Sequence, residues 1–291
     1  MGVDLEHAAA IARGIGIDEH GLRVLPISGG DIAQTYVLQS HDGWIFLKTL
    51  PLGQAGLLSA EADGLEALRE TGTVRVPGVI KRGLQDRFTW LALEYLDLQE
   101  RSERADRTLG TELAALHQHT GEHFGWRRNN YLGRTPQPNR SSDDWREFFA
   151  EQRLVHQFNR LINRQDGGAW PDLRNEVVQA WLRLTRGYRP QASLIHGDLW
   201  RGNAAALGER PVVYDPAVHY ADRECDLAMA DLFGGFAPEF FQAYQAGWPL
   251  ETGWEQRRPF YKLYHLLNHA NLFGGGYRDA VAKLSRRLIG N

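Results

Sequence analysis

The stretch HGDLWRGN occupies positions 196–203, and an Asp-Pro pair follows at positions 215 and 216. This part of the chain presents two carboxylates, Asp198 and Asp215, and one amide, Asn203. Taken singly, His-Gly-Asp is typical of a turn, Asn203 of a helix cap and Asp-Pro of a strand end. Their joint order and spacing indicate a chemical site, which guides the interpretation of the remaining sequence.

The spacing from Asp198 to Asn203 is that of the H-R-D-x-x-x-x-N catalytic loop of protein kinases. Phosphoryl transfer depends mainly on positioning the acceptor and neutralising charge. We therefore predict that Asp198 is the general base that accepts the proton of an acceptor hydroxyl, and that Asn203 and Asp215 ligate Mg2+. A P-loop site is not supported, because the motif G-x-x-x-x-G-K-[ST] is absent.

The residues between this loop and Asp215 predict a hairpin. Residues 204–207 and 211–214 form two short apolar runs, separated by Gly-Glu-Arg at 208–210. A hairpin of this kind returns the chain so that Asp215 can face Asn203, which closes the predicted metal site.

The composition is that of an ordinary folded protein. The chain has 291 residues, 43% of them hydrophobic, which is enough for one large domain or two lobes. A net charge of −3 disfavours nucleic acid as a partner. Because Cys225 is the only cysteine and the N-terminus lacks an export signal, we expect a cytoplasmic protein. No apolar run approaches the ~18 residues of a membrane span.

After an amphipathic opening segment, the first third of the chain predicts a small antiparallel sheet. Within it, Ser28, Gly29 and Gly30 could bring backbone N–H groups close to ATP phosphates, but a Gly-Gly turn between strands is also common and the pattern G-x-G-x-x-G is absent. The expected strands are 24–27, 35–39, 44–49, 76–80 and 88–93.

Lys48 lies near the end of the third predicted strand, like the kinase lysine that contacts the α- and β-phosphates of ATP. The alternative is a lysine that points into solvent. The helix that follows has a buried stripe, and Glu61 flanks it. Glu61 could therefore reach Lys48 and hold it. Glu66 competes for this role but lies further from the centre of the stripe.

Glu94, Tyr95 and Leu96 lead out of the sheet, and we expect them to form the hinge whose backbone binds the adenine ring. Beyond residue 100 the apolar spacing is helical, for example at Leu109 and Leu113. The final helices are expected over 257–273 and 277–289, and Leu173, Val177, Trp181 and Leu184 are expected to share the buried face of another.

These patterns predict an α+β, two-lobed protein-kinase-like fold. Residues 1–95 would form an ATP-binding lobe with an antiparallel sheet and one helix. Residues 96–291 would form a larger α-helical lobe that carries the catalytic and acceptor-binding residues.

The chain resembles the fructosamine-3-kinase family, also called ketosamine-3-kinases, within the aminoglycoside-phosphotransferase-like branch of the kinase fold. The resemblance spans nearly the whole chain. Beyond the motifs above, it rests on 61–65 (EADGL), 130–133 (NYLG), 135–139 (TPQPN), 222–229 (DRECDLAM), 232–236 (LFGGF) and 271–277 (NLFGGGY).

The resemblance implies ATP-dependent phosphorylation of the 3-hydroxyl of a ketoamine, which is the rearranged adduct of a sugar and an amine. The product would shed phosphate and release the amine, so the activity would repair glycated amines or proteins. The same resemblance places Trp200 beside the acceptor, with core packing as the alternative. It also makes Asp226 a buried support that hydrogen-bonds the backbone of the catalytic loop.

Two other functions fit the same motifs. A kinase of another amine-bearing alcohol, such as choline or an aminoglycoside, would have nearly the same ATP machinery. A nucleotide-binding pseudokinase would regulate a partner without turnover, but Asp198, Asn203 and Asp215 are all present. The sequence does not decide which ketoamine is preferred or whether the chain is oligomeric.

Overall fold

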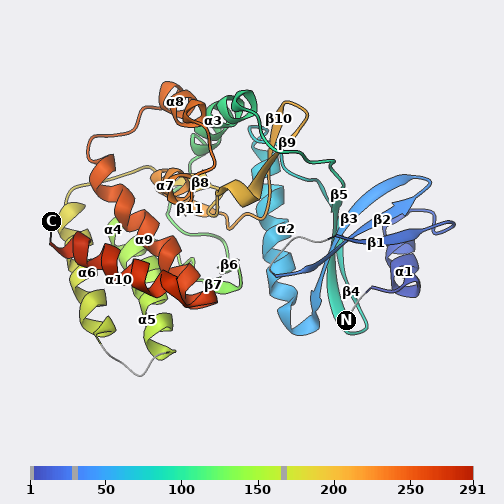
Figure 1. Ribbon diagram of the computed structural model, residues 1–291, viewed down its shortest axis with the longest axis horizontal. Helices are drawn as coiled ribbons and strands as arrows, with labels where there is room; N and C mark the ends of the chain where they lie inside the picture. Colours follow the sequence, from blue (N-terminus) through green and yellow to red (C-terminus); the bar gives the residue numbers. More distant parts are fainter. Residues whose placement is uncertain (1–2, 28–31, 165–168, 291) are drawn as a thin grey trace.

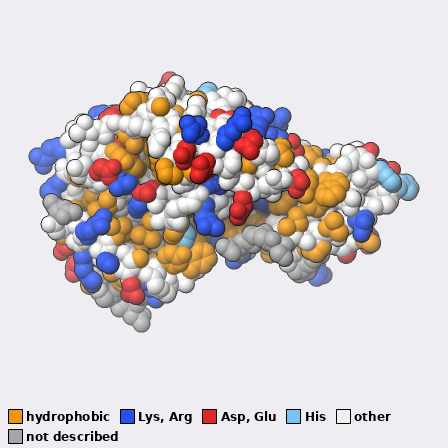
Figure 2. Space-filling model, turned by 45° about the horizontal axis from the view of Figure 1, so that its top comes forward, with side chains coloured by type: hydrophobic (Ala, Val, Ile, Leu, Met, Phe, Trp, Pro, Cys, Tyr) orange, Lys and Arg blue, Asp and Glu red, His pale blue; other side chains and the backbone are white. Residues whose placement is uncertain are grey.

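The computed structural model describes residues 3–27, 32–164 and 169–290. Figure 1 shows a smaller lobe built on a five-stranded sheet and a larger lobe made mostly of helices, with α2 (Ala55–Glu70) between them. In the space-filling view the molecule tapers from the larger lobe to the smaller one (Figure 2). None of the helices in the described ranges is long and apolar enough to cross a membrane. The two-lobed α+β fold is confirmed, and the exact division at residues 95 and 96 stays a prediction.

The sheet of the smaller lobe is antiparallel throughout and has the strand order β1-β2-β3-β5-β4. β3 is central and pairs with both β2 and β5, so Lys48 stands on a strand that is fixed on two sides. The strands are β1 (Arg23–Ile27), β2 (Gln34–Ser40), β3 (Gly43–Pro51), β4 (Val79–Gln85) and β5 (Phe88–Glu94).

Side chains alternate between the two faces of this sheet, as the period of two in a strand requires. On β5, Leu91 and Leu93 pack into the core shared with α2. Trp90 and Ala92 face the opposite side and pack with α1 (Leu5–Ile15). The sheet is thus covered on both faces, which stabilises it by burying apolar surface.

α1 adds a second helix to the single one expected in this lobe. Its start is capped by the Asp4 carboxylate, which accepts a hydrogen bond of 2.9 Å from the His7 backbone N–H. Its end is capped by Gly16 in the left-handed conformation at φ 79°. The amphipathic opening segment is therefore a complete helix.

The predicted strand at 76–80 begins later than expected, because β4 starts at Val79. Pro77 has no N–H to donate to a strand ladder. Val76 is 1% exposed and packs into the core beneath α2 without strand pairing. The apolar pattern correctly indicated burial, but the proline determines where strand pairing begins.

The larger lobe has an aromatic core that includes Trp145, Phe149 and Trp181. The apolar face predicted for α6 is buried at Val177 and Trp181, but Leu184 is 40% exposed because the helix ends there. The helices are α3 (Glu103–His117), α4 (Trp145–Phe149), a π-helical segment (Ala150–Val155), α5 (His156–Asn163), α6 (Trp170–Leu184), α7 (Glu224–Leu232), α8 (Pro238–Gly247), α9 (Trp254–Phe273) and α10 (Gly276–Ile289).

Three two-stranded sheets carry the loops that approach the smaller lobe. The sheet of β8 and β11 leads into the loop at 196–203. The sheet of β9 and β10 is the hairpin predicted from the sequence, since these two strands pair antiparallel. The pairs are β6 (Asn130–Leu132) with β7 (Thr135–Gln137), β8 (Ser193–Ile195) with β11 (His219–Ala221), and β9 (Ala204–Leu207) with β10 (Arg210–Val213).

Candidate active site

Lys48 links the sheet of the smaller lobe to the larger lobe. Its Nζ lies 2.7 Å from Glu61 Oε1 on α2 and also forms an ion pair with Asp215 Oδ1 of the larger lobe. Burial alone would lower the pKa of Lys48, but the charges of Asp215 and Glu61 outweigh it and raise the pKa above its ordinary value. The lysine is therefore a fixed cation at neutral pH.

α2 turns Glu61 toward Lys48 because Leu58 and Leu65 bury the neighbouring face of the helix. Glu66, which the sequence left as a competing partner, is exposed. The structure therefore brings together Lys48 and Glu61 and leaves Glu66 outside the site.

A second contact ties α2 to the larger lobe. Asp63, which is 7% exposed, forms an ion pair with Arg128, and that guanidinium also donates a 2.7 Å hydrogen bond to the carbonyl of Ser59. Arg82 and Arg127 approach the same carboxylate at 3.5 Å. Sequence reasoning missed this cluster, since arginines in a loop give no sign of which helix they will meet.

The catalytic loop holds Asp198 and Asn203 against each other. Asn203 Nδ2 donates to the backbone carbonyl of Asp198 at 2.9 Å and to its Oδ2 at 3.2 Å. Because both bonds use the amide nitrogen, the amide oxygen is the atom that remains for a cation. The Asn203 side chain is thus oriented by the residue that the sequence pairs with it.

Asp226 of α7 supports this loop from below. Its two carboxylate oxygens accept hydrogen bonds from the backbone N–H groups of His196 at 2.7 Å and Gly197 at 2.8 Å. His117 Nε2 lies 3.2 Å from the same carboxylate. Burial raises the pKa of Asp226, but these partners outweigh it and lower the pKa, so the carboxylate stays charged.

Gly197 is required where the chain turns into the loop. Its φ is 83°, in the left-handed region that favours glycine, and a Cβ there would lie 2.2 Å from the carbonyl oxygen of Ala217. Any larger residue would push apart the loop and the segment that follows Asp215.

Asp215 is brought beside this loop by the β9–β10 hairpin. The Tyr214 N–H donates to the Asn203 carbonyl at 3.0 Å, and the Tyr214 carbonyl accepts from His196 Nε2 at 3.0 Å. Asp215 itself has φ 56°, a left-handed conformation that is uncommon outside glycine and enriched for Asp and Asn. Its side chain is 43% exposed, so it faces open space as well as Lys48.

The two aspartates are electrostatically different. Burial raises the pKa of Asp198 to about 7, helped by the charge of Asp215 and opposed by the Asn203 amide. Burial also acts on Asp215, but the adjacent Lys48 outweighs it and lowers the pKa of that carboxyl. Asp198 can therefore exchange a proton near neutral pH, whereas Asp215 stays ionised.

The donor set fits Mg2+. Asp215 and Asn203 offer a carboxylate and an amide oxygen, which are the hard ligands that this ion prefers. Within the described residues, no three His, Cys, Asp or Glu side chains are grouped to hold a metal on their own. Asp215 and Asn203 would thus supply only part of a coordination shell, as in sites where phosphate oxygens complete the coordination of Mg2+.

Trp200 and the predicted hinge residues have partners of their own in the structure. Trp200 follows Asp198 in the loop, and its ring centroid is 6.3 Å from that of Phe233. The Glu94 carboxylate pairs with Arg75, the Tyr95 ring is tilted against that of Trp44 with their centroids 5.0 Å apart, and the Leu96 carbonyl accepts a hydrogen bond from the Leu98 backbone N–H. Ser28, Gly29 and Gly30 lie outside the described residues.

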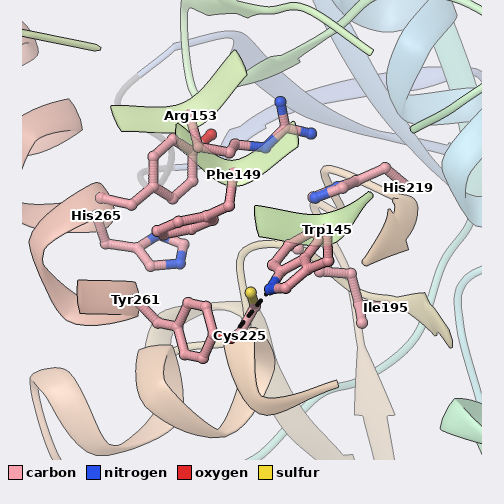
Figure 3. A pocket seen from close by; sticks show the side chains of 10 residues that line it. Trp145, Phe149, Arg153, Ile195, His219, Cys225, Tyr261 and His265 are labelled. Atoms are coloured by element: carbon pink, nitrogen blue, oxygen red, sulfur yellow. Dashed lines mark hydrogen bonds between the residues drawn. The ribbon is translucent and has the colours of Figure 1, made fainter. Parts of the chain in front are cut away.

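A small cavity lies beside the catalytic loop, which contributes Gly197 to its lining, and Figure 3 shows the side chains around it. It is lined by Trp145, Phe149 and His265, among others, and Trp145 Nε1 donates to Tyr261 OH across its floor at 3.1 Å. Its volume of about 10 Å3 suits roughly one water molecule. An acceptor substrate must therefore bind elsewhere.

A sheet lobe that delivers a lysine to the acids of a helical lobe defines a protein-kinase-like phosphotransferase. The family model described as fructosamine kinase matches residues 8–291, and the chain belongs to that family. It is an ATP-dependent phosphotransferase.

The names of individual relatives are consistent with this family. The probable ketoamine kinase of Synechocystis sp. is 43% identical over 90% of this chain and 89% of its own length. The protein-ribulosamine 3-kinase of Arabidopsis thaliana is 36% identical over 89% of this chain and 80% of its own length. A crystal structure of a suggested fructosamine-3-kinase from Thermobifida fusca covers 100% of both chains with a TM-score of 0.87 and 33% identity.

A more distant structure shares the fold alone. A spectinomycin phosphotransferase solved with ADP and spectinomycin has a TM-score of 0.60 over 100% of this chain and 98% of its own, at 15% identity. The resemblance to the fructosamine-3-kinase family that the motifs predicted is confirmed.

Proposed function

We propose that this chain transfers the γ-phosphoryl group of ATP to the 3-hydroxyl of ketoamines of the fructosamine or ribulosamine type. The observation that carries the proposal is the meeting of Lys48 with Asp215, beside the bonded pair of Asp198 and Asn203. The names of the relatives, ketoamine kinase and ribulosamine 3-kinase, support the substrate class.

In the proposed reaction, Asp198 accepts the proton of the 3-hydroxyl as that oxygen attacks the γ-phosphorus. The new O–P bond forms while the bond from phosphorus to the bridging oxygen breaks, and ADP leaves with that electron pair. A pKa of about 7 suits Asp198 to this exchange, because the carboxylate is then both available and basic near neutral pH.

Lys48, held by Glu61, binds the α- and β-phosphates of ATP, and Glu94 through Leu96 bind the adenine along their backbone. Asn203 and Asp215 hold Mg2+, which when bound neutralises charge on the phosphates. Glu61 and Asp215 both pair with Lys48, and Asp198 interacts electrostatically with Asp215, so the site needs an added cation before it can accept a polyanion.

The 3-phosphate of the product lies next to the C2 carbonyl, so the product eliminates phosphate and then releases its amine. The proposal therefore includes a role in the deglycation of amines or proteins. It also includes a lobe division at residues 95 and 96 and a cytoplasmic location, where ATP is supplied.

The test uses the purified chain with ATP and Mg2+ and follows ADP formation together with the mass and NMR spectrum of the product. Fructosamine and ribulosamine adducts of one amine are compared with the free sugars, choline and an aminoglycoside. We expect phosphate on O3 of a ketoamine and no such product in Asp198→Ala. Preference for choline or the aminoglycoside contradicts the substrate, and ATP binding without any transfer points to a pseudokinase.

A further inference from the structure

A row of aromatic side chains begins beside the catalytic loop. The ring of Trp200 contacts Phe233, whose centroid is 4.9 Å from that of His269. His269 in turn lies 5.7 Å from Phe273 and 5.1 Å from Tyr277. We call these five residues the aromatic shelf. They come from the catalytic loop, the end of α7, α9 and α10, so the sequence does not show them as one group.

Two phenylalanines of the aromatic shelf are exposed to solvent, whereas the phenylalanines of the core are buried. Phe273 is 56% exposed and Phe233 is 36% exposed, and they are the only phenylalanines among the exposed large hydrophobic residues of the described ranges. Phe148 and Phe149, by contrast, are each 1% exposed. Two exposed rings that share one histidine as neighbour form a patch, which in soluble proteins often marks a binding site.

The shelf is tied to the catalytic loop by close packing. The backbone N–H of Trp200 donates a hydrogen bond to the backbone carbonyl of Asp198 at 3.1 Å. A Cβ on Gly202 would lie 2.4 Å from the Trp200 ring. A Cβ on Gly235 would meet the side chain of Arg201 at 2.7 Å. The segment that carries Phe233 is thus pressed against the loop that carries Asp198, so the inner end of the shelf is fixed relative to Asp198.

His269 is oriented at the centre of the shelf. Its Nδ1 donates to the His265 carbonyl at 2.9 Å, which leaves Nε2 as the acceptor. Burial lowers the pKa of His269, so the ring is neutral near pH 7. A neutral acceptor between aromatic faces does not repel a cation.

We propose that the aromatic shelf binds the amine side of the ketoamine acceptor, namely a secondary ammonium and the hydrocarbon chain or ring attached to it. Aromatic faces attract ammonium groups and pack on hydrocarbon, which matches both parts of that ligand. Two carbon atoms, C2 and C1, separate C3 from the amine nitrogen, so an acceptor with its 3-hydroxyl at Asp198 has its amine close by. This inference rests on the proposed function and names the substrate class of the same site.

The exposed outer end of the shelf sets an expectation about size. Phe273 stands 56% exposed at the end of α9, so a long substituent can run past it into solvent. Adducts of benzylamine or of a lysine side chain should therefore bind better than the adduct of glycine, whose carboxylate would meet apolar rings.

The experiment compares the fructosamine adducts of benzylamine and of glycine in the wild type and in Phe273→Ala. We expect the ratio of their KM values to change about tenfold toward glycine, because both adducts carry the ammonium but only the benzyl adduct loses an aromatic contact with Phe273, which contributes about 1.4 kcal/mol. Leu184→Ala is the matched control, since it removes an exposed apolar side chain on α6, and it should leave the ratio as in the wild type.

A binding measurement separates this proposal from the proposed function. The benzylamine adduct is titrated calorimetrically, in the absence of ATP, into the wild type and Phe273→Ala, both checked for unchanged melting temperature. Weaker binding to the variant supports the shelf even if no ketoamine is turned over. Equal binding, or an equal KM effect on both adducts, overturns it.

Discussion

The proposed phosphate side and the proposed acceptor side of this site differ in the chemistry of their side chains. The phosphate side consists of buried or paired charges, with Lys48 held by Glu61 and Asp215. The acceptor side consists of uncharged rings, two of them exposed, at Phe233 and Phe273. A charged centre with fixed partners suits a triphosphate that never changes, whereas an open row of rings can accept amines of different shape.

The comparison predicts where substitutions act. Changes on the phosphate side should affect every acceptor alike, because all acceptors use the same ATP. Changes on the aromatic shelf should alter the preference among acceptors. A substitution at Lys48 that changed acceptor preference, or one at Phe273 that affected all acceptors equally, would break this division.

The largest effect is expected at Asp198. Asp198→Ala should lower kcat by about 10²–10⁴-fold, the usual contribution of a placed general base, while ATP still binds. Steady-state kinetics and an ATP titration measure the two quantities. Near-normal turnover would remove Asp198 from the chemistry.

Gly197 and Gly208 separate the cost of a left-handed backbone conformation from the cost of a steric clash. Gly197→Ala should lower the free energy of unfolding by about 2 kcal/mol more than Gly208→Ala. Both glycines have positive φ, but only Gly197 would drive its Cβ into a backbone oxygen, whereas Gly208 has open space. Urea unfolding of the two variants measures the difference, and equal losses would show that conformation alone sets the cost.

Glu61 and Glu66 form a matched pair on one helix. Glu61→Gln should raise the KM for ATP by about tenfold, because it weakens a charge-assisted hydrogen bond to Lys48. Glu66→Gln should have no effect, since that side chain is exposed. The account is contradicted if the two variants have the same KM for ATP.

The pH profile tests Asp198 without any substitution. With the pKa of Asp198 near 7, the active carboxylate form declines as pH falls, so kcat/KM drops below about pH 7 and by about tenfold for each further pH unit. Glu61→Gln should keep this acid limb if Asp198 causes it. An acid limb near pH 4 would mean that Asp198 titrates as an ordinary carboxylate.

The charged side of the site was largely predictable from the sequence. The distance along the chain from Asp198 to Asn203 is constrained by one short loop, and the β9–β10 hairpin is local. Such features depend on neighbours within a few residues. Lys48 and Glu61 were found because strand and helix periods are regular, which fixes the direction in which each side chain points.

The remainder depends on tertiary packing. Asp63 pairs with Arg128 because α2 packs against the loop before β6. The sequence around either residue does not indicate that contact. Likewise Phe233 and Phe273 look like core residues in the sequence, and their exposure follows from the way α7 and α9 end beside each other. Pro77 is a local signal for the late start of β4, but the prediction gave more weight to the apolar pattern around it.

The central claim is that Asp215 brings a divalent cation to a triphosphate beside Lys48. ATP is titrated calorimetrically with and without Mg2+ into the wild type and Asp215→Asn; asparagine also tolerates the left-handed backbone at this position, so the fold is preserved. We predict that Mg2+ strengthens ATP binding to the wild type and that the variant loses this gain while still binding ATP alone. An equal gain from Mg2+ in both proteins would contradict the claim.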